Sequence, residues 1–349
     1  MNTSPNNDLN QADHSRELAE ASPNVTHHRS GVLFKGTIGL LTLILIATGI
    51  IFWRNANRSE AEESVSPIVE AATVRDGEEN GMDLDSDANG DSDRGFTAGI
   101  NQATIDAAEH PLHPLIELAD RAIENIDQNY FDYTATLTNQ VRVNGKLRPV
   151  NKLFIKIRHA RTNDDGSQIP FSVYTKFLEP AANAGREVIW VDGWNEGNLV
   201  VHLTGWQNLM RIYLDPTGSM AMDGNLYPVS MIGMRNLLKQ IREIGMQDCE
   251  HDGCNVKIER GLKLHDRWVT KIESIHPHQE SHFEYHIARI FIDEEWGLPV
   301  GYEGYIWPEK AGGEPVLLER YFYTDVQLNV GLQDLDFDPA NPEYDFPSR

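Results

Sequence analysis

The stretch Asp132–Arg158, DYTATLTNQVRVNGKLRPVNKLFIKIR, decides the fold of this chain. Apolar and polar residues alternate from 132 to 143 and again from 152 to 158, with the period of two typical of half-buried strands. Asn144-Gly145 lies between them, and this pair favours a tight hairpin turn because both residues tolerate positive φ. The stretch therefore predicts an antiparallel hairpin, to which the rest of the sheet is added.

Outward from this hairpin, the chain repeats the strand pattern between turns rich in Gly, Pro, Asn and Asp. Further strands are expected at 171–178, 186–191, 198–203, 211–214, 255–259, 267–275, 282–293, 298–307 and 316–327. Apolar residues at helical spacing predict a helix over 115–126, opened by Pro111 and Pro114, and a second over 231–246. The expected fold class is α+β, a strongly curved antiparallel sheet covered by helices.

A segment of 18 residues without charge, Gly36–Trp53, precedes this body. About 20 apolar residues cross a bilayer as a helix, and Lys35 and Trp53 suit its two interfaces. The alternatives are a buried core helix or a cleaved signal peptide, but about 30 polar residues come first and no small-residue cleavage site follows. We expect one transmembrane helix that anchors the chain.

The distribution of charged residues separates the remaining chain into segments. The net charge is −23, which argues against a nucleic-acid partner. Between 59 and 109 there are 14 acidic and 2 basic residues and few hydrophobic ones, as in disordered tethers. The expected organisation is a disordered cytoplasmic head at 1–30, a transmembrane helix at 31–54, an acidic disordered linker at 55–109 and a folded domain at 110–349.

The linker contains one candidate metal site. Asp85, Asp87, Asn89 and Asp91 place oxygens on alternate residues around Gly90, as in the first half of a calcium-binding loop. The twelfth position holds Phe96 instead of a bidentate Glu. The site is therefore either a calcium loop or a solvated acidic linker, and no other cofactor is expected.

The only two cysteines, Cys249 and Cys254, lie close together in CEHDGC. In an oxidising compartment they would form a small disulfide loop. The alternatives are a reduced pair, or a zinc site to which His251 contributes one ligand. We expect the disulfide, with the folded domain outside the cytoplasm.

Histidines and carboxylates gather in two further places. If 282–293 is a strand, even spacing places on one face the residues His276, His278, Glu280, His282, Glu284 and His286. Such a face is either a metal site or a solvent-exposed side. Asp293-Glu294-Glu295 suggests acid–base chemistry or a charged turn. No catalytic motif is present, and we do not expect an enzyme.

Methionines concentrate around the second helix. Since thioether side chains adapt to varied apolar partners, a helix lying over a concave sheet would turn them toward a ligand. An ordinary core is the alternative. The candidate ligand-binding residues are Met220, Met222, Met231, Met234 and Leu238.

Three stretches carry a resemblance to a known family: FSVYTKFLEPAANAGREVIWVDGWNEGNLVVH, YLDPTGSMAMDGNLYPVSMIGMRNLL and YFYTDVQLNVGLQDLDFDPANPEY. They resemble an uncharacterised bacterial family of secreted or membrane-anchored proteins, which is similar to the LolA/LolB lipoprotein-sorting fold. The resemblance covers about Leu115 to Tyr344. It implies a half-open barrel closed by helices around an apolar cavity. No LolA functional residue matches this chain position by position.

These observations predict a single-pass inner-membrane protein whose folded domain is periplasmic or otherwise extracytoplasmic. Its expected function is to bind lipid, acyl chains or another apolar ligand in a LolA-like cavity, with a lipid or lipoprotein as partner. The alternative is an envelope sensor or interaction module that binds a protein and carries no lipid.

Overall fold

The computed structural model describes residues 73–74, 95–205 and 209–348. The expected anchor Gly36–Trp53 and the acidic loop at 85–91 lie outside the described residues. Within the described part of the chain, no helix combines the length and the hydropathy needed to cross a bilayer.

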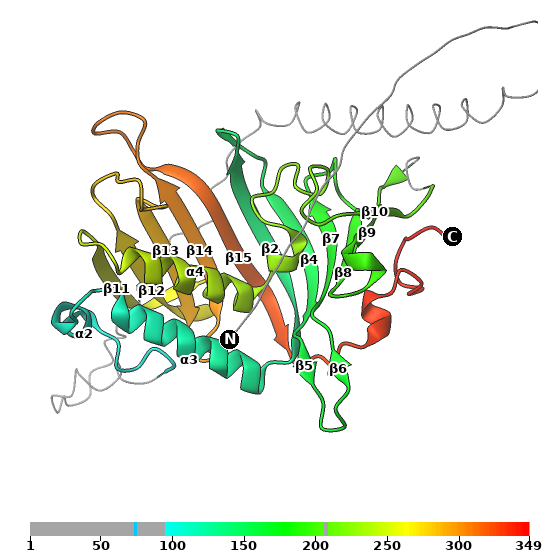
Figure 1. Ribbon diagram of the computed structural model, residues 1–349, viewed down its shortest axis with the longest axis horizontal. Helices are drawn as coiled ribbons and strands as arrows, with labels where there is room; N and C mark the ends of the chain where they lie inside the picture. The colour runs from blue at the N-terminus through cyan, green and yellow to red at the C-terminus, as the bar shows by residue number, and fades with distance from the viewer. Residues whose placement is uncertain (1–72, 75–94, 206–208, 349) are drawn as a thin grey trace, which may run out of the picture. The chain divides into compact units, whose positions relative to one another are not determined.

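Within the described residues, one antiparallel sheet of thirteen strands forms the folded body (Figure 1). Across the sheet the strands follow the order β1-β11-β12-β13-β14-β15-β2-β4-β7-β8-β9-β10, with β3 beside β2, and the sheet is not closed. The strands are β1 (Thr73–Val74), β2 (Asp132–Val143), β3 (Lys146–Leu147), β4 (Asn151–Arg158), β7 (Ser172–Glu179), β8 (Glu187–Val191), β9 (Leu199–His202), β10 (Ile212–Leu214), β11 (Asn255–Leu264), β12 (Arg267–Ile275), β13 (Ile287–Asp293), β14 (Pro299–Ile306) and β15 (Val316–Leu328). A separate pair is formed by β5 (Arg161–Thr162) and β6 (Gln168–Ile169).

The expected hairpin is confirmed. Strands β2 and β4 pair antiparallel from Asp132↔Arg158 to Asn139↔Asn151. At the turn, Asn144 and Gly145 have φ of 51° and 74°, the positive values that this dipeptide favours. The sheet then grows on both sides of the hairpin, through β7 on one side and β15 on the other.

Two helices, α3 (His113–Asn129) and α4 (Met234–Asp248), cover one face of the sheet, which we call the inner face (Figure 1). Both expected helices are confirmed, although α4 begins three residues after Met231. Gly233 precedes it with φ of 110°, which a non-glycine residue rarely adopts, and a 3₁₀ turn η3 (Val229–Met231) comes before. The helices and the antiparallel sheet together confirm the α+β class.

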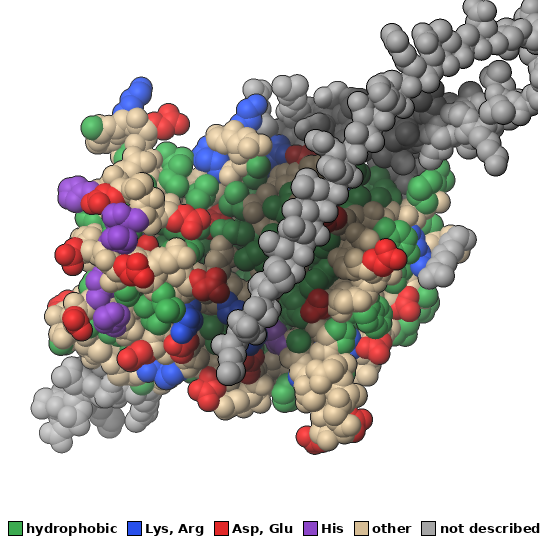
Figure 2. All heavy atoms as spheres, viewed as in Figure 1, with side chains coloured by type: hydrophobic (Ala, Val, Ile, Leu, Met, Phe, Trp, Pro, Cys, Tyr) green, Lys and Arg blue, Asp and Glu red, His purple; other side chains and the backbone are tan. Residues whose placement is uncertain are grey.

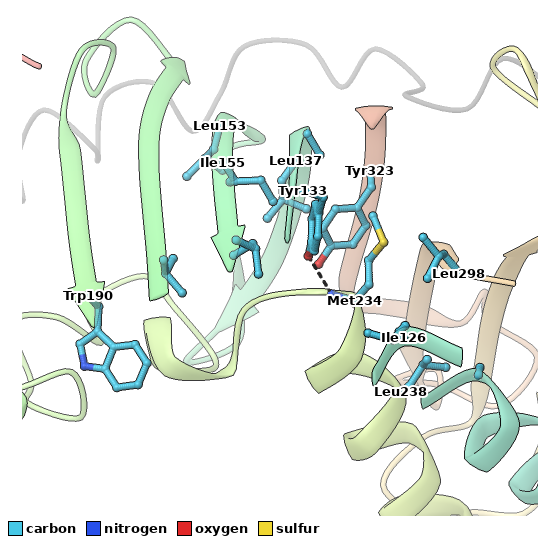
Figure 3. Close-up of a cluster of buried hydrophobic side chains, with 14 of the residues drawn as sticks. Ile126, Tyr133, Leu137, Leu153, Ile155, Trp190, Met234, Leu238, Leu298 and Tyr323 are labelled. Atoms are coloured by element: carbon cyan, nitrogen blue, oxygen red, sulfur yellow. Dashed lines mark hydrogen bonds between the residues drawn. The ribbon is translucent and has the colours of Figure 1, made fainter. Parts of the chain in front are cut away.

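The core of the inner face centres on β2 and β4 (Figure 3). Tyr133 and Leu137 of β2 pack with Ile155 of β4, and all three are at most 2% exposed. The Tyr133 hydroxyl accepts a hydrogen bond of 3.1 Å from the backbone N–H of Met234. This bond joins the first turn of α4 to the centre of the sheet.

The C-terminal segment covers the opposite, outer face of β4, β7 and β8. Its 3₁₀ turn η4 (Asp334–Phe337) buries Phe337 against Tyr174 and Ile189. Lys156 of β4 pairs with Asp336 at 2.6 Å. Outward-facing residues of the central strands are therefore buried as well, beneath the last residues of the chain.

A polar network lies under this segment. Glu187 is fully buried and accepts hydrogen bonds from Tyr174 Oη at 2.5 Å, His202 Nε2 at 2.6 Å and the Asp345 backbone N–H at 2.9 Å. His202 Nδ1 lies 2.9 Å from the Leu203 carbonyl oxygen, so both ring nitrogens have a polar partner. Burial alone would raise the pKa of Glu187, but these donors hold it at about 2.

The expected linker boundary is wrong. The folded body begins by Gly95 and not at His110, since residues 95–107 form a turn and a short helix, α2 (Gln102–Ala107). Ile100 and Ile105 are 4% and 3% exposed and pack on the helix–sheet core. The excess of acidic residues at 59–109 led to the prediction of a disordered linker, although Ile100 and Ile105 in this range are buried.

The expected strand over 282–293 is wrong in its first half. Strand β13 begins at Ile287, and residues 276–286 form the loop that joins it to β12. The backbone N–H of His276 donates to the His286 carbonyl at 2.8 Å and closes this hairpin. The histidines of this region therefore do not share one strand face.

Candidate functional site

A cavity lies between the two helices and the sheet. Its walls come from α3, α4 and the strands β12, β13 and β14. Ala119 on α3, Gly245 on α4 and Ala288 on β13 line it, where larger side chains would fill the space between helix and sheet. Arg235 and Asp127 hold the helices together outside the cavity, with N–O distances of 2.5 and 2.7 Å.

Most of the lining is aliphatic. The aliphatic side chains are Leu112, Leu115, Ile116, Leu118, Leu238, Ile241, Ile244, Ile272, Ile290 and Ile292. The space open to the centres of water-sized spheres is about 90 Å³, and all space between the lining atoms, mouth included, is about 840 Å³. One buried water needs roughly 10–15 Å³ of space open to sphere centres, so the 90 Å³ of this cavity is several times that amount. Along α4 the lining runs from Leu238 to Asp248, about 15 Å at 1.5 Å per residue.

Two polar side chains line this cavity where α4 and β12 both end. Asp248 is the last residue of α4, and His276 follows β12; they are 5% and 2% exposed. Asp248 Oδ2 and His276 Nε2 are 3.5 Å apart. Burial, then the charge of Glu284, raises the pKa of Asp248 to about 6, and burial lowers the pKa of His276. The site thus disfavours charge on both groups.

The ring of His276 is fixed in orientation. Nδ1 lies 2.9 Å from the carbonyl oxygen of Tyr285 and donates to it, while the ring stacks on Phe283 with centroids 4.0 Å apart. With the proton on Nδ1, Nε2 of the neutral ring is an acceptor. Nε2 is buried and has no hydrogen-bond partner among the described residues.

A buried carboxylate, Glu319 of β15, belongs to the neighbouring part of the inner face. It is 1% exposed and accepts hydrogen bonds from Tyr285 at 2.6 Å, Tyr321 at 2.9 Å and Tyr227 at 3.2 Å. Burial raises the pKa of Glu319, and the three hydroxyl donors oppose that rise. Tyr285 also lines the cavity, so this network fixes part of its wall.

The expected disulfide is not formed in the structure. Cys249 and Cys254 are free thiols. Cys249 caps the end of α4 and its Sγ lies 3.3 Å from His110 Nδ1, while Cys254 is buried in the apolar cluster beside Val256. Burial raises the pKa of both thiols, that of Cys254 to about 12, which makes them poor nucleophiles.

The other histidines and carboxylates form contacts within the fold. Figure 2 shows histidine side chains gathered along one side of the inner face. His251 and His282 stack with ring centroids 3.7 Å apart, and no group of three or more potential ligands among the described residues is arranged to hold a metal ion. Asp293 is buried, pairs with Arg267 at 2.6 Å and accepts from the backbone N–H of Trp296. It holds a turn.

The candidate ligand-binding residues occupy different positions. Leu238 lines the cavity. Met234 is 1% exposed and packs in the core of the inner face, as the alternative for the methionines proposed. Met220 and Met231 are 42% and 40% exposed and Met222 is half-buried, and none of the three is among the lining residues. A ligand role for these three methionines stays a prediction.

Sequence reasoning missed Asp248, and it singled out His276 only as one member of a histidine-rich strand face. The available signal was the inner stripe of α4, on which Met234, Leu238, Ile241 and Gly245 recur at helical spacing. The next position of that stripe is Asp248, a charged residue where an apolar one is expected. The position of His276 beside Asp248 had no such signal, because it depends on the loop that returns to β13.

Comparison with known proteins places these features in context. A model of the family described as protein of unknown function DUF1571 matches residues 130–346. This confirms the resemblance to an uncharacterised family. No curated protein matches.

Among solved structures, the chain is similar to a DUF1329 family protein from Desulfovibrio piger, with 13% identity, a TM-score of 0.32 and coverage of 64% of this chain and 95% of that one. It is similar to a putative outer membrane lipoprotein-sorting protein domain from Vibrio parahaemolyticus, with 11% identity, a TM-score of 0.31 and coverage of 64% and 95%. It is also similar to the Mycobacterium tuberculosis lipoprotein LppX, with 12% identity, a TM-score of 0.35 and coverage of 65% and 100%.

Proposed function

Because this chain belongs to the DUF1571 family, whose function is unknown, we propose a function from its own geometry. The protein binds the apolar chain of a lipid in the cavity beneath α3 and α4. The segment Gly36–Trp53 anchors it to a membrane, and the folded body lies outside the cytoplasm. The cavity is the observation that carries this proposal.

The cavity suits a chain-shaped ligand for two reasons. Its lining is aliphatic along most of its length, so a hydrocarbon chain would leave water without losing hydrogen bonds. Its lining also extends along α4 from Leu238 to Asp248, about 15 Å at 1.5 Å per residue, so the space is elongated.

An anchored protein would meet its ligand at the membrane. The test therefore uses the full chain in lipid vesicles, with a long-chain fatty acid methyl ester that carries a photoactivatable diazirine at its tail. After irradiation, peptide mapping locates the labelled residues. We expect labels on peptides from α3, α4, β12 and β13.

Two matched variants test whether the label enters the cavity. Gly245→Leu projects a side chain from α4 into the cavity, where the nearest atom to an added Cβ is Ile116 Cγ1 at 3.5 Å. We expect it to reduce cavity labelling about tenfold. Gln247→Leu adds the same side chain at an exposed position of α4 and should leave labelling unchanged. Ala119→Leu repeats the test from α3.

Two results would contradict the proposal. One is labelling spread evenly over the surface, and the other is cavity labelling that Gly245→Leu and Ala119→Leu leave unchanged. The alternative of a protein-interaction module predicts that result together with recovery of one stoichiometric partner protein from cross-linked membranes.

A further inference from the structure

The polar end of the cavity contains two hydrogen-bond acceptors that face each other. Nε2 of His276 is an acceptor because Nδ1 already donates to the Tyr285 carbonyl. The carboxyl of Asp248 has no hydrogen-bond partner among the described residues, and its Oδ2 lies 3.5 Å from Nε2. Polar groups buried in this way are normally satisfied, so the unpartnered Nε2 of His276 indicates a missing donor.

Asp248 is also unfavourably placed. It ends α4, where the partial negative charge of the helix dipole opposes a carboxylate. Its burial and the nearby Glu284 raise its pKa to about 6. A buried acid with this environment costs stability in the absence of a ligand, and a donor would offset part of that cost.

Cations in the lining are engaged elsewhere. Arg242 donates to Asp120 and to Met246 Sδ on the outside of the helices. Arg289 pairs with Glu273 at 2.6 Å and with Glu303 at 3.4 Å. Neither is available to a negative headgroup, and Asp248 and Glu284 would repel one.

We propose that the ligand carries an uncharged headgroup with hydroxyl donors, such as the glycerol diol of a monoacylglycerol. This inference rests on the proposed function, since the acyl chain occupies the aliphatic part of the cavity. One hydroxyl donates to Nε2 of His276, and a second donates to the carboxyl of Asp248. The ester and chain continue along α4 toward Leu238.

The headgroup chemistry follows from the acceptor pair. A fatty acid or a phosphate-bearing lipid would bring negative charge beside Asp248, while the two arginines of the lining pair with other side chains. A methyl ester has only acceptors and would leave both buried groups unfilled. A diol supplies two donors and no charge, and its two oxygens match two acceptors that lie side by side.

The test compares three diazirine-tailed probes of equal chain length on the full chain in vesicles at neutral pH: a monoacylglycerol, its methyl ester and the free fatty acid. We expect half-maximal cavity labelling by the monoacylglycerol at about tenfold lower probe concentration than by the methyl ester, equivalent to about 1.4 kcal/mol. The fatty acid should require more probe than either.

Two variants remove the acceptors. Asp248→Leu replaces the carboxyl with an aliphatic side chain, and His276→Asn keeps an amide donor near the Tyr285 carbonyl but removes the acceptor at Nε2. Each should abolish the preference for monoacylglycerol over methyl ester. Gln247→Leu, beside Asp248 but exposed, should keep the preference.

Outcomes separate this inference from the proposal it rests on. Equal cavity labelling by monoacylglycerol and methyl ester, or tighter labelling by the fatty acid, would overturn the headgroup assignment and leave the cavity proposal standing. A preference that survives in both acceptor variants would overturn it too. Absence of cavity labelling by every probe would overturn both.

Discussion

Asp248 and Glu187 are two buried carboxylates with opposite electrostatic surroundings. Asp248 lies at the end of a helix, with no hydrogen-bond donor to its carboxyl among the described residues, and its pKa is raised to about 6. Glu187 lies under the C-terminal segment with three donors, and its pKa is held at about 2. The first residue destabilises the fold at neutral pH and the second stabilises it, so their pH signatures differ in sign.

Replacing Asp248 by Asn should stabilise the protein. The folded state binds a proton on Asp248 up to about pH 6, while the unfolded state releases it near the ordinary pKa of 3.8. The cost is therefore complete above pH 6 and absent below about pH 4. We expect a gain of about 1–3 kcal/mol in the free energy of unfolding at pH 8. Denaturant titrations at pH 8 and pH 4 measure it, and an equal gain at both pH values would contradict the explanation.

Replacing Glu187 by Gln should destabilise the protein by about 2–4 kcal/mol, because three buried donors lose their charged acceptor. In the wild type this stabilisation is present above pH 4.5 and is lost as the pH falls toward 2. The difference between variant and wild type in denaturant titrations should therefore shrink below pH 4. A difference that is constant from pH 7 to pH 3 would argue against the buried network.

Among the elements, α4 shows how far local sequence rules extend. Its apolar spacing predicted a helix, and Gly233 rather than Met231 determined where it begins. The hairpin of β2 and β4 was predicted almost to the residue, because strand alternation and the Asn144-Gly145 turn are both local signals.

What could not be predicted depends on distant contacts. Residues 276–286 alternate as a strand would, but the hydrogen bond from His276 to His286 makes them a hairpin loop. Ile100 and Ile105 are too few for a periodicity signal, and they fold because they reach the helix–sheet core. The cavity itself arises from small residues on separate elements, Ala119, Gly245 and Ala288, whose meeting no local pattern encodes.

Substitution by alanine should have opposite effects on protein stability at Gly245 and at Gly233, the two glycines of the α4 region. Gly245 lies inside the helix, and an added Cβ would meet Ile116 at an ordinary 3.5 Å, so Gly245→Ala should stabilise by about 0.5–1 kcal/mol through helix propensity. Gly233 has φ of 110°, and an added Cβ would lie 3.1 Å from the Tyr133 hydroxyl. Gly233→Ala should destabilise by about 1–3 kcal/mol.

Thermal unfolding of both variants provides the measurement, with Gln247→Ala as an exposed control on the same helix. Two shifts of the same sign would mean either that Gly233 does not have a positive φ or that Gly245 does not lie within a regular helix.

At the scale of the whole molecule, the C-terminal segment is part of the fold. Phe337 is 1% exposed, and its ring lies under the Arg158 guanidinium at 4.9 Å. The segment buries the outer face of strands whose inner face already forms the core. The central strands are thus covered on both faces. Helices and loops cover the inner face, and the C-terminal segment covers the outer face.

Truncating Phe337 to Ala should cost about 3–5 kcal/mol, the usual range for a fully buried phenylalanine. The loss should appear as a lower denaturant midpoint with an unchanged slope, since the whole sheet unfolds together. Leu335→Ala, at a 53% exposed position of the same turn, should cost less than about 0.5 kcal/mol. An equal loss in the two variants would mean that η4 does not bury Phe337 against the outer face of the sheet.

The pairing of β15 with β2 has a consequence for the timing of folding. These neighbours at the centre of the sheet are joined from Glu319↔Val141 to Leu328↔Tyr133, although the 172 residues from 144 to 315 separate the two strands in sequence. During synthesis β2 can pair with β4, but its other edge stays open until β15 has emerged. The nascent protein therefore carries an exposed central strand while the 172 residues between β2 and β15 are translated. A chain exported before folding would keep that edge unpaired until it arrives, and its final assembly is an event of the destination compartment.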